Sequence, residues 1–525
     1  MQATLPWSLC FSGFTTIFQV VRSSRMSQRL VITLLQLILT GQTIAALFPP
    51  SNETTHLAAL QACHQLKSSL GSSIVQSSGP EYQATATNAW NLENSKFQPT
   101  CVVFPRVTAH VQTAMKTIFV AGSHYAVQAG SHSAMRGWNS VQDGVLILFS
   151  HMNNASYDQV TDTITLEPGI HWQEAVAALA PFGVAPVALA TLVQDSSWVA
   201  AYHTSALLKG YAADNFKALD VVLVNGDLVT ATATNEYSDL FRALKGGGNR
   251  FGIVTRYELI PAHTGTENDK NFFGGLLMYN SSAEALLKAT AKYVREVNDP
   301  NAVLLVALNN VIVGRELIPS YIAVMFYRGS ELPMDIFGDF LAIPTISSSL
   351  SSPLGPKSYV DVMATLGLES ERGFVQRFGA SALDGNEVDK FLDAFNHWTN
   401  FTMSFTDVFN LTTLAFTPIP ESQVQAGRNK GGNIINPSRG GFAAVQLAEQ
   451  FNAGIEDVSP AVQNGIDLLF EQIPPSSGLP LYLNECDAGQ EVFESYGDFE
   501  LLKQIYAKYD PTRFNVEHLR GPGGL

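Results

Sequence analysis

Three segments in the first half of the chain carry apolar residues at helical spacing. Residues 56–71 (HLAALQACHQLKSSLG) and 110–123 (HVQTAMKTIFVAGS) place apolar side chains three and four positions apart. Residues 172–183 (WQEAVAALAPFG) repeat this pattern. The spacing predicts a helix in each segment.

Short runs rich in β-branched residues lie between and after these segments. They are YAVQAG, GVLILFS, TDTITLEPG, LDVVLVNGDLVTATA and FGIVTRYELI, and each closes on Gly, Asn, Asp or another turn residue. Such runs are typical of strands bounded by turns. Strands interleaved with helices predict an α+β lobe over residues 47–265.

From residue 271 the apolar runs lengthen. FFGGLLMYN, AVLLVALNNVIVG and SYIAVMFYRG predict neighbouring antiparallel strands, with SAEALLKATAKYVREV as a helix packed on them. We expect a second lobe, an antiparallel sheet covered by helices, over residues 266–470. Residues 471–525 return to a helical pattern in DFELLKQIYAKYD, and we assign them to the first lobe.

Composition and charge narrow the class of protein. The 525 residues are 46% hydrophobic and 15% charged, which is typical of an ordered chain with more than one core. The 31 Lys and Arg against 46 Asp and Glu give a formal charge of −15, and no basic run stands out. A nucleic-acid or anionic-membrane partner is therefore disfavoured, and we expect a monomer that acts on a small molecule.

The N-terminal region has the layout of a secretory signal. From Met26 the chain carries Arg29, an apolar run over residues 30–39, and small residues before Pro49. The run is short for a membrane span, although an anchor is the alternative. Residues 1–46 are therefore assigned to a signal and an upstream extension, which reflects an earlier start or a gene-model error.

Cysteines and sequons agree with export. In an oxidising compartment Cys63 and Cys101 are the natural pair, Cys10 leaves with the signal and Cys486 stays free, although spacing alone does not prove the bond. Five N-x-S/T sequons are present, at Asn52, Asn154, Asn280, Asn400 and Asn410. We expect a secreted, N-glycosylated protein.

Several catalytic motifs are missing. The chain has no phosphate loop, no G-x-G-x-x-G, no zinc signature and no G-x-S-x-G, so we expect no metal site. Glycine-rich turns remain at Gly130, Gly137, Gly144, Gly169, Gly210 and residues 246–248. They allow close backbone approach to a long ligand, or they are ordinary turn glycines.

Read in order, several segments resemble one known family. They are CVVFPRVTAHVQTAMKTIF, AVQAGSHSAMRGWNSVQDGVLILFSHMN, TITLEPGIHWQEAVAALAPFGV, GYAADNFKALDVVLVNGDLV, DLFRALKGGGNRFGIVTRYEL and LYLNECDAGQEVFESYGDFELLKQIYAKYDP. Together they resemble the oxygen-dependent FAD-linked oxidases of the vanillyl-alcohol-oxidase and berberine-bridge-enzyme type, particularly the secreted fungal branch. The resemblance covers residues 63–525 and implies a two-lobed fold with a PCMH-type FAD-binding domain and a separate substrate domain.

The resemblance implies that His132 binds FAD covalently at the flavin 8α-methyl. Its small neighbours Gly130, Ser131, Ser133 and Gly137 would let the flavin ring approach the backbone. An uncoupled loop histidine is the alternative. No cysteine lies between Cys101 and Cys486, so at most one covalent link is expected.

The chain departs from the family's glycine-rich pattern. Ser131 replaces the glycine before the histidine, and Ser196 and Ser197 stand where the family has further glycines. Serine has less access to positive φ and adds a Cβ atom beside the pyrophosphate. A shifted binding loop, weak or absent FAD, and a wrongly predicted exon are three explanations, and we favour a diverged loop that binds FAD.

The resemblance also implies further cofactor contacts. Gly210, Asp214 and Asn215 would shape the turn under the cofactor, and Gly252, Ile253 and Val254 would contact its adenine end. Residues 428–438 (RNKGGNIINPS) resemble a substrate-lobe loop, with a surface turn as the alternative.

The resemblance implies that Tyr482 of LYLNE is the catalytic base, because the family brings the hydroxyl of a Y-x-N segment toward the flavin; Asn484, on the same strand face, would position flavin or substrate. A tyrosine of ordinary pKa, about 10, needs help to act at neutral pH, and a structural strand tyrosine is the alternative. We expect hydride transfer to flavin N5 and reoxidation by O2 to hydrogen peroxide, on an apolar substrate of fungal secondary metabolism. A carbohydrate oxidase and a flavin-free scaffold are the alternatives.

Overall fold

The computed structural model describes residues 53–86, 88–187, 210–348, 351–366 and 372–525. Residues 55–525 form one compact unit. The expected signal, Cys10, Ser196 and Ser197 lie outside the described residues. In the part of the chain that the structure describes, no helix is long and apolar enough to cross a membrane.

A small sheet near the N-terminus has the strand order β1-β2-β4-β3, in which β2, β4 and β3 are parallel. The strands are β1 (Val75–Gln76), β2 (Cys101–Val103), β3 (Tyr125–Gln128) and β4 (Val145–Leu148). Two predicted helices, α3 (Glu53–Leu70) and α6 (Thr108–Ala121), share a buried core with the sheet. The Cys63–Cys101 disulfide forms as expected and ties α3 to β2.

A second sheet is antiparallel, with the order β5-β6-β10-β8-β9. Its strands are β5 (Ala155–Asp158), β6 (Thr163–Leu166), β8 (Phe216–Val222), β9 (Leu228–Thr232) and β10 (Ile253–Leu259). The predicted helix α7 (Trp172–Leu179) and helix α9 (Ser238–Leu244) bury apolar side chains in the same core. Two further short strands, β7 (Val184–Ala185) after α7 and β11 (Ala262–His263) after β10, pair antiparallel with each other.

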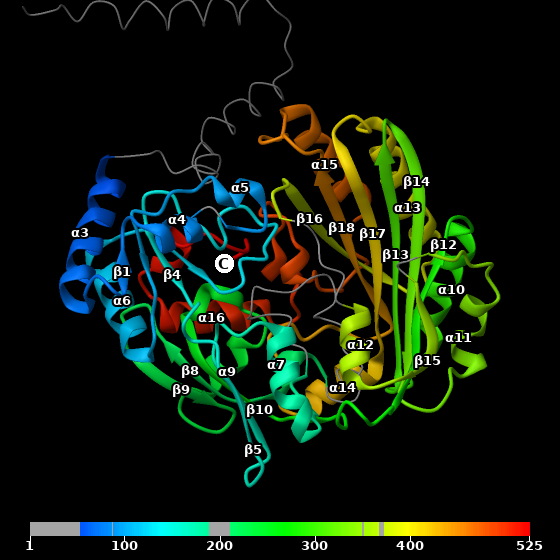
Figure 1. Ribbon diagram of the computed structural model, residues 1–525, viewed down its shortest axis with the longest axis horizontal. Helices are drawn as coiled ribbons and strands as arrows, with labels where there is room; N and C mark the ends of the chain where they lie inside the picture. The colour runs from blue at the N-terminus through cyan, green and yellow to red at the C-terminus, as the bar shows by residue number, and fades with distance from the viewer. Residues whose placement is uncertain (1–52, 87, 188–209, 349–350, 367–371) are drawn as a thin grey trace, which may run out of the picture. The chain divides into compact units, whose positions relative to one another are not determined.

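The largest sheet is antiparallel and has the strand order β15-β12-β14-β13-β17-β18-β16 (Figure 1). Its strands are β12 (Phe272–Tyr279), β13 (Ala302–Val313), β14 (Glu316–Tyr327), β15 (Ser352–Lys357), β16 (Gln376–Asp384), β17 (Phe409–Ile419) and β18 (Phe442–Phe451). Sequence patterns predicted β12, β13 and β14 and their antiparallel pairing, which is confirmed.

The two faces of this sheet are both buried but against different partners. One face shares a core with α10 (Ala283–Glu296), α11 (Met334–Leu341), α13 (Val388–Ser404) and α15 (Pro460–Gln472). The other face joins the core that holds α7, β8 and β10. Because each β-strand alternates its side chains between faces, this one sheet joins two cores.

The remaining helices are short or return to the first lobe. They are α4 (Pro80–Ala86), α5 (Leu92–Ser95), α12 (Tyr359–Leu366), α14 (Glu421–Asn429), α16 (Phe499–Tyr509) and α17 (Phe514–His518). Helix α16, predicted from its spacing, contacts α9 (Figure 1). The expected α+β fold, with an antiparallel sheet covered by helices, is confirmed, whereas the domain limits at residues 46, 265 and 470 stay predictions.

Candidate active site

The loop after β3 carries His132 against an aromatic platform. The imidazole stacks on the Trp90 indole with ring centroids 4.1 Å apart and planes 27° from parallel. Trp90 is 1% exposed and packs in turn on Phe378 of β16 at 5.5 Å. His132 is half-buried, so the ring has a fixed support and an open side.

Ser131 takes a backbone conformation that favours glycine. Its φ is 66°, and its carbonyl accepts hydrogen bonds from Trp90 N, Ser133 N and Asn139 Nδ2 at 3.3, 3.1 and 2.8 Å. Both Ser131 and Ser133 are buried. Ser131 therefore adopts a left-handed turn that favours glycine, with several hydrogen bonds stabilising it.

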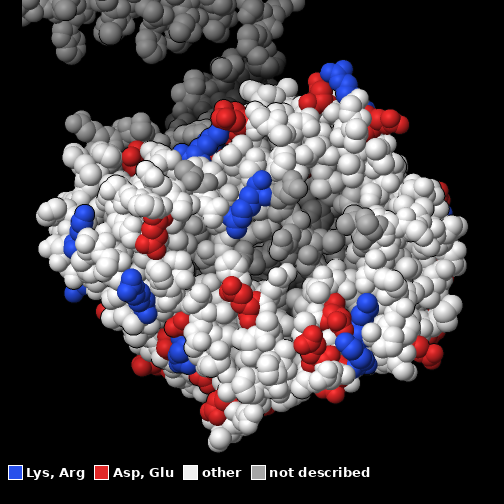
Figure 2. Space-filling model, in the orientation of Figure 1, with Lys and Arg blue, Asp and Glu red and all other residues white. Residues whose placement is uncertain are grey.

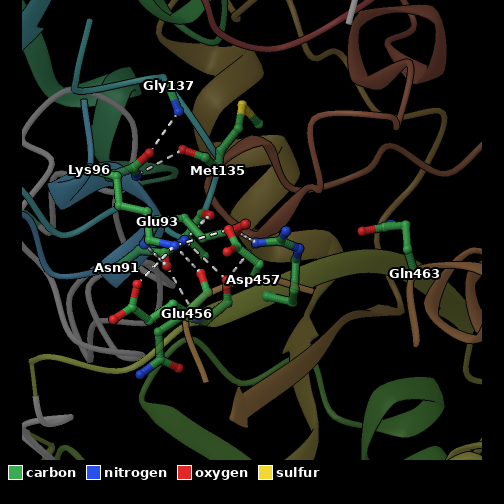
Figure 3. Close-up of polar contacts among 12 residues, drawn as sticks. Asn91, Glu93, Lys96, Met135, Gly137, Glu456, Asp457 and Gln463 are labelled. Atoms are coloured by element: carbon green, nitrogen blue, oxygen red, sulfur yellow. Dashed lines mark hydrogen bonds and ion pairs between the residues drawn. The ribbon is translucent and has the colours of Figure 1, made fainter. Parts of the chain in front are cut away.

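Two buried asparagines hold this loop from the segment before β2 (Figure 3). Asn91 donates to the Ala134 carbonyl at 2.8 Å and also bonds the backbone of Gln376 in β16. Asn94 donates to the carbonyls of Ser133 and Met135 at 3.2 and 3.1 Å, and accepts from Gly137 N at 2.7 Å. Together they fix the backbone of residues 133–137, directly after His132.

Gly137 turns the same loop beneath a C-terminal arginine. Its φ is 80°, and a Cβ placed there would lie 2.4 Å from Cδ of Arg520. Two other glycines, Gly144 and Gly169, approach protein backbone instead: an added Cβ would lie 2.6 Å from the His124 carbonyl oxygen and 1.8 Å from that of Phe149. Gly144 and Gly169 are therefore explained by close packing against protein backbone and not by contact with a ligand.

A buried ion pair lies beside the asparagines. Glu93 of α5 pairs with Arg377 of β16, and their side chains are 7% and 9% exposed. Nearby, Lys96 reaches the exposed Asp457 at 2.9 Å (Figure 3). Each pair joins the segment that supports His132 to the second lobe, which contains the largest sheet and which we call the sheet domain.

One cavity is lined by the β3 end, the 248–254 turn and the C-terminal segment. Gly252, Ile253 and Val254, the predicted contacts of the adenine end, lie in its wall, together with apolar residues such as Val127 and Tyr257. Two buried polar atoms of the lining, Trp138 Nε1 and Asn249 Oδ1, have no hydrogen-bond partner among the described residues. Unsatisfied donors and acceptors in an apolar slot suit a planar, nitrogen-rich ring.

The turn before β8 is built around Asp214. Its carboxylate accepts from Tyr211 N at 2.9 Å and from Asn433 Nδ2 at 3.0 Å. Burial raises the pKa of Asp214, while Asn433 and the nearby Lys245 favour the charged form. Gly210, with φ of 83°, is needed because a Cβ there would lie 2.8 Å from Asp214 Oδ2.

Within residues 428–438, Asn433 and Ile434 are buried against that turn, whereas Arg428, Asn429, Gly431 and Ser438 are exposed. Asn433 is 5% and Ile434 0% exposed. Lys430 donates to Asn215 Oδ1 at 2.5 Å, and Asn215 Nδ2 donates to the Tyr211 carbonyl at 2.9 Å. Asp214 and Asn215 therefore shape the turn as predicted and also anchor this loop of the sheet domain.

A second cavity contains Tyr482 in its wall. Its described lining is apolar except for Tyr211, Tyr482, Tyr496 and Asn433; the apolar members include Ile419, Ile435, Phe442, Pro480, Leu481 and Leu483. A Cβ added at Gly248, which lines the first cavity, would lie 3.4 Å from Leu483 of the second. The two cavities are therefore neighbours.

Asn484 Nδ2 donates to the Tyr482 hydroxyl oxygen at 3.1 Å. The expected strand is wrong: Leu483–Glu485 form a 3₁₀-helix, because Glu485 N bonds back to the Tyr482 carbonyl at 3.0 Å. The Leu481 N–H donates to Ser495 Oγ at 2.9 Å, which is a side chain and not a neighbouring strand. The two residues still meet, because a tight turn brings their side chains together.

Sequence patterns did not reveal several residues that build the site. Trp90, Asn91, Asn94, Arg372 and Arg377 lie outside every motif that we singled out. Asn91 and Asn94 bond residues 39 to 285 positions away, and their three-residue spacing in WNLEN was the one local signal. Gly252, Ile253 and Val254 line the first cavity, whereas the lining of neither cavity includes a residue from Gly130 to Gly137; Ser196 and Ser197 lie outside the described residues.

Residues 99–232 match the family model for an FAD binding domain. An uncharacterized FAD-linked oxidoreductase of Arthroderma benhamiae is 26% identical over 475 residues, covering 84% of this chain and 90% of that protein. The FAD-dependent monooxygenase drtC of Aspergillus calidoustus is 25% identical over 498 residues, covering 89% and 90%. The resemblance drawn from the sequence is confirmed: the chain has an FAD-binding domain and is a homologue of fungal FAD-linked oxidoreductases.

Solved structures show the same fold. Xylooligosaccharide oxidase from Myceliophthora thermophila C1 superimposes with a TM-score of 0.69 at 16% identity, covering 89% of this chain and 99% of that one. Berberine bridge enzyme from Eschscholzia californica gives 0.66 at 14% identity, covering 88% and 99%. The chain therefore has the two-lobed fold of these flavin enzymes.

The residues present fit FAD, which is the cofactor of this protein. Trp138 and Asn249, each with a buried polar atom that lacks a partner among the described residues, belong to the lining of the first cavity. Small or tightly turned residues surround His132, and the second cavity adjoins the first. The flavin-free alternative is therefore set aside, and the chain is an FAD-linked oxidoreductase.

Proposed function

We propose that this protein is an oxygen-dependent FAD oxidase that carries its flavin on His132 and oxidises an apolar small organic molecule in fungal secondary metabolism. The observation that supports it best is the second cavity, where the Tyr482 hydroxyl meets Asn484 among apolar side chains. Bound FAD supplies the hydride acceptor and passes the electrons to dioxygen.

Tyr482 is the proton acceptor of this proposal. Its hydroxyl oxygen accepts from Asn484 at 3.1 Å, and a hydrogen bond to a phenolate oxygen favours the ionised form that removes a proton. The apolar walls formed by Ile419, Phe442 and Leu481 exclude water from the reacting C–H bond. Asn433 and the tyrosine hydroxyls are the polar groups that orient the substrate.

The bond to His132 needs an oxidant as well as a histidine. His132 would hold FAD through one ring nitrogen, and dioxygen would serve as the two-electron oxidant that this bond needs. Support by Trp90 holds the imidazole in one orientation for this bond.

Two other enzyme classes fit the family. The relative drtC of Aspergillus calidoustus is an FAD-dependent monooxygenase, and xylooligosaccharide oxidase shares the fold. A carbohydrate site needs many polar groups, whereas the described lining of the second cavity holds one amide and three tyrosines, with no acidic or Trp side chain, among apolar residues. This composition favours the apolar substrate.

The test has two stages. Purified protein is precipitated with acid, and a yellow pellet reports covalent flavin, which the variant His132→Ala should lose. Turnover is then followed with sugars and with hydrophobic alcohols under isotopically labelled dioxygen. Formation of one hydrogen peroxide per product molecule, with no label in the organic product, supports the oxidase. Label in the organic product identifies a monooxygenase. Activity on sugars alone overturns the apolar substrate.

Export with N-glycosylation stays part of this proposal. The Asn154, Asn280 and Asn400 sequons are exposed, and the Cys63–Cys101 disulfide suits an oxidising compartment. Secretion from a fungal host should require residues 26–46, and a glycosidase should lower the mass of the exported protein. A monomer is expected in solution, which light scattering checks.

A further inference from the structure

We propose that Arg372 and Ser131 form a clamp between the sheet domain and the FAD-binding loop, and that this clamp positions the His132 imidazole. The inference rests on the proposed bond between His132 and FAD. Arg372 is a positioning residue here, because it acts through the backbone that carries the histidine.

One guanidinium holds both segments whose rings are stacked. Arg372 Nη1 donates to the Asn88 carbonyl at 2.6 Å and to Ser131 Oγ at 2.8 Å. Its Nη2 donates to the Gly130 carbonyl at 3.2 Å. Asn88 lies two residues before Trp90, and Gly130 and Ser131 directly precede His132, so the planar fork of donors joins the two partners of the ring stack.

Ser131 supplies the acceptor that a glycine would lack. Its hydroxyl also donates to the Asn88 carbonyl at 3.1 Å, so Ser131, Asn88 and Arg372 form a closed set of three contacts. A serine at φ of 66° is strained relative to glycine, and these bonds offset that strain. The replacement of the family glycine by Ser131 is thereby explained together with Arg372.

Arg372 lies next to β16, the strand that supports the Trp90–His132 stack. Arg372 precedes β16, whose Phe378 packs on Trp90 and whose Gln376 bonds Asn91. The residues around His132 are therefore held at two points, by β16 and by Arg372 in the segment that leads into it. A fixed imidazole favours the covalent attachment of FAD, because the ring nitrogen stays in the reactive orientation.

The main variant is Arg372→Ala, with Arg372→Lys as the conservative change. Arg328→Ala is the matched control, because Arg328 is also an exposed arginine of the sheet domain that donates to a carbonyl of the other lobe, that of His263 at 3.3 Å. Flavin-free protein is incubated with FAD, and covalent attachment is followed by acid precipitation. Reversible FAD affinity is measured separately on the His132→Ala background, and hydrogen exchange is measured on a peptide spanning residues 128–140.

Arg372→Ala should slow covalent attachment roughly tenfold, with little change in reversible FAD affinity, because it disturbs orientation rather than binding. Exchange in residues 128–140 should rise. Arg372→Lys should recover part of the rate, since an ammonium donates but lacks the planar fork. Arg328→Ala should match the wild type in both readouts.

Ser131→Gly gives a second test that does not depend on one variant folding. In its background Arg372→Ala should slow attachment by a smaller factor, because one acceptor is gone and the turn is relaxed. Equal behaviour of Arg372→Ala and Arg328→Ala in attachment and exchange overturns the clamp, and so do fully additive effects of Ser131→Gly and Arg372→Ala. A wild type without covalent flavin overturns the His132 bond and the positioning role, and exchange then decides whether the clamp exists.

Discussion

The side-chain amide of Asn433 donates to the carboxylate of Asp214 at 3.0 Å, across 219 residues of sequence. Asn433 belongs to the loop between α14 and β18, and Asp214 to the turn before β8. Both are buried, at 5% and 1% exposure. This contact joins the sheet domain to the FAD-binding domain beside the second cavity, which Asn433 also lines.

Asn433→Ala should destabilise the fold by about 1–3 kcal/mol, because Asp214 Oδ1 would remain buried without its donor. Urea unfolding measures the change. Asn429→Ala is the control, since Asn429 is exposed on the preceding helix and should leave the midpoint unchanged. Equal midpoints for the two variants would contradict the role given to this contact.

Breaking the buried Glu93–Arg377 pair should cost far more than breaking an exposed one. Arg377→Met leaves the Glu93 carboxylate buried without its partner, and we expect a loss of about 3–5 kcal/mol in the free energy of unfolding. Lys96→Met, which removes the exposed contact with Asp457, should cost about 0–1 kcal/mol. Thermal and urea unfolding compare the two, and similar losses would disprove the difference in burial.

Stability should fall as pH rises from about 4.5 to about 8 through Glu449. Burial raises the pKa of Glu449 to about 8 from its ordinary 4.5, with Asp487 adding to the rise and Arg377 opposing it. In this window the native state holds a proton that the unfolded chain has released, so each pH unit lowers the free energy of unfolding by up to about 1.4 kcal/mol. Above pH 8 the contribution levels off.

Glu449→Gln should remove this part of the pH dependence, because the amide does not titrate. Urea unfolding at several pH values measures the slope. Glu485, whose pKa burial also raises to about 8, contributes with the same sign and remains in the variant. Exposed Glu236→Gln is the matched control, and a slope that Glu449→Gln leaves intact would argue against a buried proton there.

Tyr482→Phe should lower kcat roughly 10²–10⁴-fold if the hydroxyl is the proton acceptor of the proposed reaction. Flavin content should stay unchanged, since His132 is untouched. The pH profile of kcat/KM should also lose the limb that reports this group. Tyr157→Phe, at a half-buried tyrosine of β5, is the control; full activity in Tyr482→Phe would assign the base elsewhere.

Local patterns sufficed for the regular elements near the site. Helices α3, α6, α7 and α16 and strands β3, β4 and β10 follow from spacing, because periodic apolar side chains must face a core whatever that core contains. The segment at Tyr482 is the counterexample. Its alternating LYLN pattern predicted a strand, but Leu481 N found a side-chain acceptor and the chain turned into a 3₁₀-helix.

The sequence by itself determined the α+β fold with its helix-covered antiparallel sheet and the kind of cofactor, because these depend on local periodicity and on motifs in a fixed order; that His132 carries the flavin stays a prediction. Only the tertiary structure decided what holds that histidine. Trp90 beneath it, Arg372 across Ser131 and Asn91 on Gln376 are contacts between segments about 40 to 285 residues apart. A single polar or aromatic residue has no periodicity, so its partner is set only when the packed lobes bring the two side chains together.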